Sequence, residues 1–153
     1  MQVQEACHAT SRRFLIEVIP DGWEHAPIRL VRAVEALYRA GLVPDWWKLP
    51  PLTSPAAWRA IGEVLRAHDP QCKGVVILGL DRTETELADA FGAAVNETLV
   101  VGFAVGRAVF REPAEAYLAG SIDAGEAACA LRERYQRILD LWHGRAQAVA
   151  SRR

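Results

Sequence analysis

Residues 73–94 read KGVVILGLDRTETELADAFGAA. The first part, 73–80, is a short apolar run rich in β-branched residues, which is typical of a buried strand. Thr83 and Glu86 follow with the spacing of a capping box, which predicts the start of a helix. The apolar residues after them recur at helical spacing: Leu87, Ala90, Phe91 and Ala94. This stretch therefore predicts one strand–turn–helix unit.

The same kind of unit recurs along the chain. Apolar runs occupy residues 13–20, 43–49, 73–80 and 99–105, so their starts are separated by 30, 30 and 26 residues. A βα unit has about this length. Strands that are apolar on both faces and alternate with helices indicate a parallel sheet in an α/β fold.

Local signals also mark the ends of the other helices. Gly41 has the position of a helix C-terminal glycine, and Ser54 followed by Pro55 predicts a helix start. A short helix is predicted over residues 113–118. A longer final helix is predicted from Asp123, which again has a glutamate three residues later.

A chain of 153 residues is expected to form one domain. We expect a flexible lead-in over residues 1–11, the folded domain over 12–145, and a frayed tail over 146–153. Four consecutive βα units with parallel strands are half of a (β/α)8 barrel, and they could also form a small open sheet with helices on both faces. Four strands cannot close a barrel of that type, so half a barrel would need a second half from another copy or another chain.

Composition excludes several classes of protein. Hydrophobic residues make up 51% of the chain and charged residues 24%, which excludes a disordered tail. No apolar run approaches the roughly 20 residues that cross a bilayer, and the first residues lack the apolar core of a signal peptide, so we expect a cytoplasmic protein without membrane contact. The net charge of −1 argues against nucleic acid as the main partner.

Polar residues at the ends of the apolar runs are the candidates for function. Glu17, Lys48, Asp81 and Arg107 lie on or just after the four successive runs. In parallel α/β folds the loops after the strands build the ligand site. We therefore expect these four side chains to converge at one edge of the sheet.

This set suits carbonyl chemistry on an anionic substrate. A lysine amine attacks a ketone when it is unprotonated, and burial of Lys48 beside Trp46 would favour that neutral form. Glu17 or Asp81 could move protons. Gly106 permits close approach of the backbone, and Arg107 at a helix start would hold a phosphate or a carboxylate.

Each of these residues also has a structural interpretation. Glu17 could be an ion-pair partner of Lys48 or Arg107, and Asp81 could begin the turn into the next helix. Lys48 could extend its ammonium group into water or form an ion pair, and Arg107 could cap the sheet. Trp47, Trp58 and Trp142 are expected in the core. No metal site is predicted, because Pro70 interrupts the helix between His68 and Cys72.

Several motifs resemble one bacterial family. They are LIEVIP, AGLVPDWWKL, GVVILGLD and GFAVGR, followed by a C-terminal helix that contains Trp142. The family is the domain of unknown function that follows the sugar-kinase domain of some 5-dehydro-2-deoxygluconokinases, and it is similar to tagatose-bisphosphate aldolases, which are class I (β/α)8 barrels. The resemblance covers residues 13–143 and corresponds to the C-terminal half of that barrel.

The resemblance implies a lyase of inositol catabolism. Its substrate would be the phosphorylated sugar 5-dehydro-2-deoxygluconate 6-phosphate, cleaved to dihydroxyacetone phosphate and malonate semialdehyde. Lys48 matches the Schiff-base lysine, Glu17 an acidic residue on the preceding strand, and Gly106 with Arg107 the phosphate-binding end of the last strand. Asp81 is a second candidate for proton transfer, and Trp46 and Gly79 are further candidates for substrate binding. The chemistry implied needs neither a metal nor a cofactor.

The rival hypothesis is a non-catalytic module that binds a phosphosugar or serves in assembly. An isolated half-barrel exposes apolar sheet edges, which favours pairing. Its expected partners are a second copy of the chain, a complementary N-terminal half-barrel or a kinase domain.

Overall fold

The computed structural model describes residues 2–150 and has an α/β fold. In chain order, the elements are α1 (Gln2–Ala9), β1 (Leu15–Glu17), α2 (Ile28–Arg39), β2 (Trp46–Leu49), α3 (Pro55–His68), β3 (Gly74–Leu78), α4 (Glu84–Ala94), β4 (Val100–Ala104), α5 (Arg107–Leu118) and α6 (Ala124–Ala150). This order confirms the predicted alternation of strands and helices.

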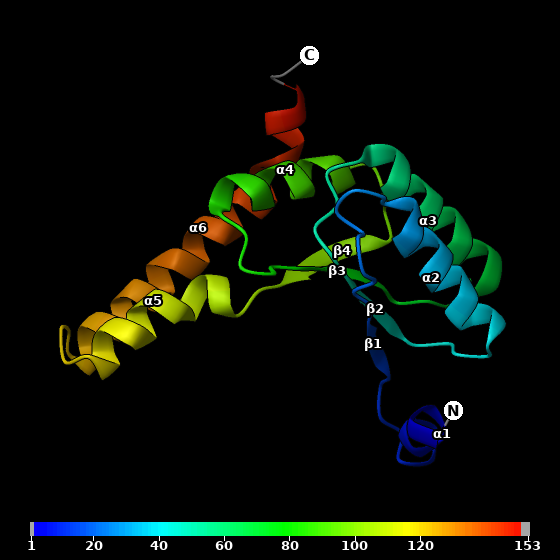
Figure 1. Ribbon diagram of the computed structural model, residues 1–153, viewed down its shortest axis with the longest axis horizontal. Coiled ribbons are helices and arrows are strands. Elements are labelled where there is room, and N and C mark those ends of the chain that lie inside the picture. The colour runs from blue at the N-terminus through cyan, green and yellow to red at the C-terminus, as the bar shows by residue number, and fades with distance from the viewer. Residues whose placement is uncertain (1, 151–153) are drawn as a thin grey trace.

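The four strands form one parallel sheet in the order β1-β2-β3-β4. Glu17 is paired in register with Lys48, and Lys48 with Val76. The ladder between β3 and β4 has an irregularity between Val75 and Val76. Strands that follow one another along the chain are neighbours in the sheet, and α2, α3 and α4 lie together on one side of it (Figure 1).

The core lies between this side of the sheet and the helices. Trp47, Leu49, Val75 and Ile77 alternate along β2 and β3 and are at most 1% exposed. They belong to one cluster with buried residues of α2, α3, α4 and α6. Within residues 2–150, the helices of this cluster therefore cover one face of the sheet, in contrast to the alternative with helices on both faces.

The predicted tryptophan positions fit this core. Trp47, Trp58 and Trp142 are buried, as expected. Trp58 donates through its indole N–H to the carbonyl oxygen of Leu52 at 2.9 Å. Because side chains alternate along a strand, Trp46 and Lys48 point to the opposite, uncovered face.

The predicted helix caps are also confirmed. The Ser54 hydroxyl accepts from the backbone N–H of Ala57, and Thr83 forms a reciprocal capping box with Glu86. Asp123 and Glu126 form the same arrangement at the start of α6, where each backbone N–H donates to the other's carboxylate at 2.8 Å. Local sequence therefore determines these boundaries.

One helix boundary needs correction, and both ends of the described chain contain helix. Within the expected lead-in over residues 1–11, Gln2–Ala9 form α1, which is attached through Gln4 to the backbone of Gly41 and Val43. The helix expected over residues 113–118 begins at Arg107 and contains Pro113 in its interior. The frayed tail expected from residue 146 is helical as far as Ala150, and residues 151–153 lie outside the described part of the chain.

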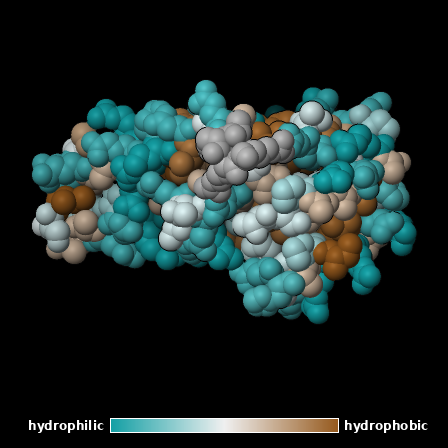
Figure 2. Space-filling view, turned by 90° about the horizontal axis from the view of Figure 1, so that it is seen from above, coloured by the Kyte–Doolittle hydropathy of each residue, from teal (hydrophilic) through white to brown (hydrophobic). Residues whose placement is uncertain are grey.

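The face of the molecule that Figure 2 shows is mainly hydrophilic, with hydrophobic residues scattered among the polar ones. Within residues 2–150, no helix combines the length and the apolar character that a membrane span requires.

Candidate functional site

A cleft of about 220 Å³ lies at the carboxyl ends of the strands. Six of the seven predicted site residues line it: Glu17, Lys48, Gly79, Asp81, Gly106 and Arg107. They come from all four strands or the loops that directly follow them. Parallel strands bring their carboxyl ends to one edge of the sheet, so the topology explains why residues far apart in sequence meet here.

Lys48 and Glu17 form an ion pair in this cleft. The Lys48 Nζ atom lies 2.7 Å from Glu17 Oε2, and the two side chains are 27% and 41% exposed. The pair follows from the register of β1 and β2, in which the two residues are direct neighbours. An ammonium group bound to a carboxylate must lose a proton before it can attack a ketone. Glu17 is within proton-transfer distance of the amine and can accept that proton.

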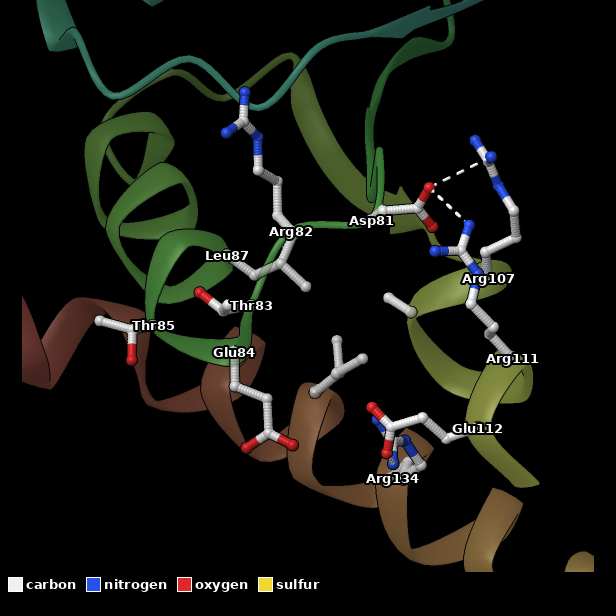
Figure 3. A pocket seen from close by; sticks show the side chains of 12 residues that line it. Asp81, Arg82, Thr83, Glu84, Thr85, Leu87, Arg107, Arg111, Glu112 and Arg134 are labelled. Carbon is white, nitrogen blue, oxygen red and sulfur yellow. Dashed lines mark hydrogen bonds and ion pairs between the residues drawn. The ribbon is translucent and has the colours of Figure 1, made fainter. Parts of the chain in front are cut away.

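Asp81 binds two arginines of α5 (Figure 3). Its Oδ2 atom accepts a hydrogen bond from Arg111 Nη2 at 2.9 Å and lies 3.1 Å from Arg107 Nη1. Leu80 and Asp81 both have positive φ angles, 46° and 57°, a conformation that is unfavourable for residues with a side chain. The turn is closed by the backbone N–H of Arg82, which donates to the Gly79 carbonyl at 3.0 Å.

The start of α5 is the part of the cleft that suits an anion. Gly106 is its N-cap residue, and the first turn contains no acidic side chain. The first backbone N–H groups of a helix have no acceptor within it, and the helix dipole favours negative charge there. The Arg107 side chain is 57% exposed, so it is accessible to a ligand in the cleft. This geometry can hold a phosphate or a carboxylate.

Of the predicted substrate-binding residues, Gly79 lies in the cleft and Trp46 lies outside it. Gly79 lines the cleft and packs closely on the chain after β4, because a Cβ atom there would lie 3.1 Å from Val105 Cγ1. Trp46 shares the face of Lys48 but does not line the cleft, since it lies at the beginning of β2. The structure therefore brings Gly79 to the candidate site and leaves Trp46 outside it.

A second cavity, of about 470 Å³, lies beside the cleft between α4, α5 and α6. It shares Asp81 and Arg107 with the cleft, and most of its wall is charged (Figure 3). Its arginines are already bound to acidic side chains: Arg134 pairs with Glu112 at 2.5 Å, and Arg82 pairs with both Glu24 and Glu86. We interpret this cavity as the centre of an ion-pair network that joins the helices.

Arg111 is the site residue that the sequence analysis missed. It lies one helical turn after Arg107, so both guanidinium groups reach the same carboxylate. The i, i+4 spacing of the two arginines is visible in the sequence. The helix was expected to begin at Pro113, however, six residues after the observed start of α5 at Arg107. An earlier helix start would have placed both arginines on one face.

The fold and the cleft together define a parallel α/β protein whose polar residues gather at the carboxyl ends of its strands. A family model described as "Uncharacterized protein conserved in bacteria (DUF2090)" matches residues 1–146, which is nearly the whole chain. The chain belongs to this family. A search of the curated proteins found no match.

Proposed function

We propose that this domain is a cytoplasmic class I aldolase that acts on a phosphorylated keto sugar. The observation that supports this proposal best is the contact between the Lys48 amine and the Glu17 carboxylate, in the same cleft as Arg107 and the start of α5. The sequence resemblance makes 5-dehydro-2-deoxygluconate 6-phosphate the substrate of choice. Dihydroxyacetone phosphate and malonate semialdehyde are then its products.

The reaction begins when the Lys48 amine attacks the ketone carbon and water leaves, which forms an iminium ion. A carboxylate then removes the proton from the hydroxyl group on the β-carbon. The bond between the α-carbon and the β-carbon breaks, and its electron pair moves into the iminium group to form an enamine. The β-carbon leaves as the aldehyde product. Protonation of the enamine and addition of water release dihydroxyacetone phosphate and restore the amine.

Each residue of the cleft has a separate part in this scheme. Glu17 takes the proton of the amine and is the first candidate for the later proton transfers, with Asp81 as the second. Arg107 and the backbone at Gly106 bind the phosphate, which places the ketone near Lys48. Asp81 is bound to two arginines, so it is better placed to orient Arg107 than to reach the substrate.

The second candidate function is phosphosugar binding without catalysis. The observation that favours it is the same ion pair, since a lysine held by Glu17 can be purely structural. This hypothesis retains the anion site and assigns no chemistry to Lys48.

Borohydride trapping distinguishes the two functions. The protein is incubated with dihydroxyacetone phosphate, reduced, and analysed by intact mass and peptide mapping. We expect an adduct on Lys48 that is lost in Lys48→Ala and kept in Lys73→Ala, the matched control at the other lysine of the chain. Modification of Lys73 alone would refute Lys48 as the nucleophile. Protection against unfolding by the phosphate ester without any adduct would favour the binding module.

A further inference from the structure

The face of the sheet opposite the helices is open. Parallel sheets in α/β proteins are normally covered on both faces, because their strands are apolar on both sides. Here Leu15 of β1 and Val101 of β4 are each 46% exposed, whereas residues of the covered face such as Trp47 and Ile77 are fully buried. The two exposed residues lie on the two outermost strands, and Trp46, Lys48 and Val76 between them on the same face are partly exposed.

Both edges of the sheet are open as well. In the described sheet, β1 pairs with β2 and β4 pairs with β3, so each has one strand neighbour. The second edge of such a strand presents backbone N–H and C=O groups that can pair with another strand. The described part of the chain thus has two unpaired parallel edges and one uncovered face.

The amount of exposed surface is large for a protein of this mass. The chain exposes 9092 Å², whereas a compact monomer of 16.9 kDa exposes about 7,700 Å². The projecting α5–α6 hairpin contributes part of the excess of about 1,400 Å² (Figure 1). The excess is of the same order as the roughly 800 Å² that each partner buries in a standard stable interface.

We propose that a second copy of this chain covers the open face and closes an eight-stranded parallel barrel. A two-fold axis along the strand direction would place β1 of each copy beside β4 of the other, with all strands parallel and all helices outside. The pairing is self-complementary, since each copy offers one edge of each kind. Glu17 and Lys48 neutralise each other on the open face, so two copies can approach without repulsion between them.

Closure also changes the candidate site, and this part rests on the proposed function. The side chains of Lys48 and Glu17 are partly exposed in the single chain. They lie on the face that becomes the barrel interior, so the second copy removes water from the amine that must attack the ketone. The dimer would have two such sites, and the rate of imine formation should depend on protein concentration.

The test is the mass of the full chain in solution, measured by light scattering over a range of concentrations. We expect about twice 16.9 kDa. Leu15→Glu and Val101→Glu should each weaken the dimer at least tenfold, because each places a charge in the closed interior. Both positions are half-exposed in one chain, so each variant should keep its secondary structure by circular dichroism. Leu118→Glu is the matched control, since Leu118 is 82% exposed at the end of α5 and should leave the dimer unchanged.

Two results would overturn the inference. One is a folded monomer at every concentration. The other is a dimer that both sheet variants leave intact, because its interface then lies elsewhere. Imine trapping is measured separately, so a dimer without an adduct would refute the aldolase and leave the closed barrel standing. An adduct formed equally well by a monomer would refute the closed barrel and leave the aldolase standing.

Discussion

Replacing Gly62 in α3 with alanine should destabilise the protein, although alanine is the better helix former. An alanine in a helix interior is ordinarily about 1 kcal/mol more favourable than glycine. At this position, however, a Cβ atom would lie 2.0 Å from Glu97 Oε2 and 2.4 Å from Glu97 Cδ. No real Cβ contact is so short, so the Glu97 carboxylate would have to move.

The Glu97 carboxylate has little freedom to move. The residue is 7% exposed, and its two oxygens accept hydrogen bonds from Arg66 at 2.8 and 3.1 Å. It also accepts from the backbone N–H of Leu99 at 3.1 Å, and its hydrogen bonds hold the pKa of Arg66 above the ordinary value. Breaking a buried ion pair costs about 3–5 kcal/mol, and the lower end applies because Arg66 is half-exposed. After the helix gain of about 1 kcal/mol, a net loss of about 2 kcal/mol remains.

Thermal and urea unfolding measure this loss, which should lower Tm by roughly 6 °C. Gly144→Ala in α6 is the matched control, since a Cβ atom there meets nothing within 4 Å, and it should stabilise the protein slightly. In a Glu97→Ala background the clash with the carboxylate disappears, and Arg66, whose Nη2 atom would lie 2.7 Å from the new Cβ atom, is released and can move away. Gly62→Ala should then become neutral or stabilising. If Gly62→Ala alone raised the stability as Gly144→Ala does, the reasoning about the carboxylate would be wrong.

Three further predictions concern single side chains. The backbone N–H of Phe14, and then Arg13, lower the pKa of Asp45 below its ordinary value, so the stability that this carboxylate contributes is full above about pH 4 and is lost as the pH falls further. Asp45→Asn should therefore flatten the decline of the unfolding free energy below about pH 4, measured by urea unfolding at a series of pH values. Asp81→Asn should tighten the binding of inorganic phosphate at least twofold by calorimetry, because it removes the carboxylate that occupies two arginines; weaker binding would contradict this. Cys129 is exposed, whereas burial raises the pKa of the Cys72 thiol, so Cys129 should react with a thiol reagent before Cys72 does. Peptide mapping that finds Cys72 labelled before Cys129 would exclude this order.

Features that depend on local sequence could be predicted well. Strands with β-branched runs and helices with capping residues, such as Ser54 or Thr83, appear where the pattern placed them. The convergence of the strand-end residues followed from one further assumption, that the strands are parallel. Glu17 and Lys48 meet because their strands are neighbours in register, which the order of the chain already suggested.

Features that depend on distant contacts could not be predicted. Helix α1 has no buried residue, and Gln4 attaches it to residues almost 40 positions away. The helix predicted over residues 113–118 begins earlier, at Arg107, and α5 continues through Pro113 although proline is unfavourable in a helix interior. Glu97 lies in the loop between α4 and β4, where the sequence has no helical or strand periodicity, and its partner Arg66 belongs to α3.

The left-handed conformations of Leu80 and Asp81 affect how the domain folds. The left-handed conformation costs roughly 1–2 kcal/mol for each residue, so neither adopts it readily by itself. Tertiary contacts must therefore impose it, and the ion pairs from Asp81 to α5 can do so only after α5 has docked. We therefore expect the edge of the candidate cleft to form late in folding and to open early in local unfolding, in contrast to the strand that leads into it.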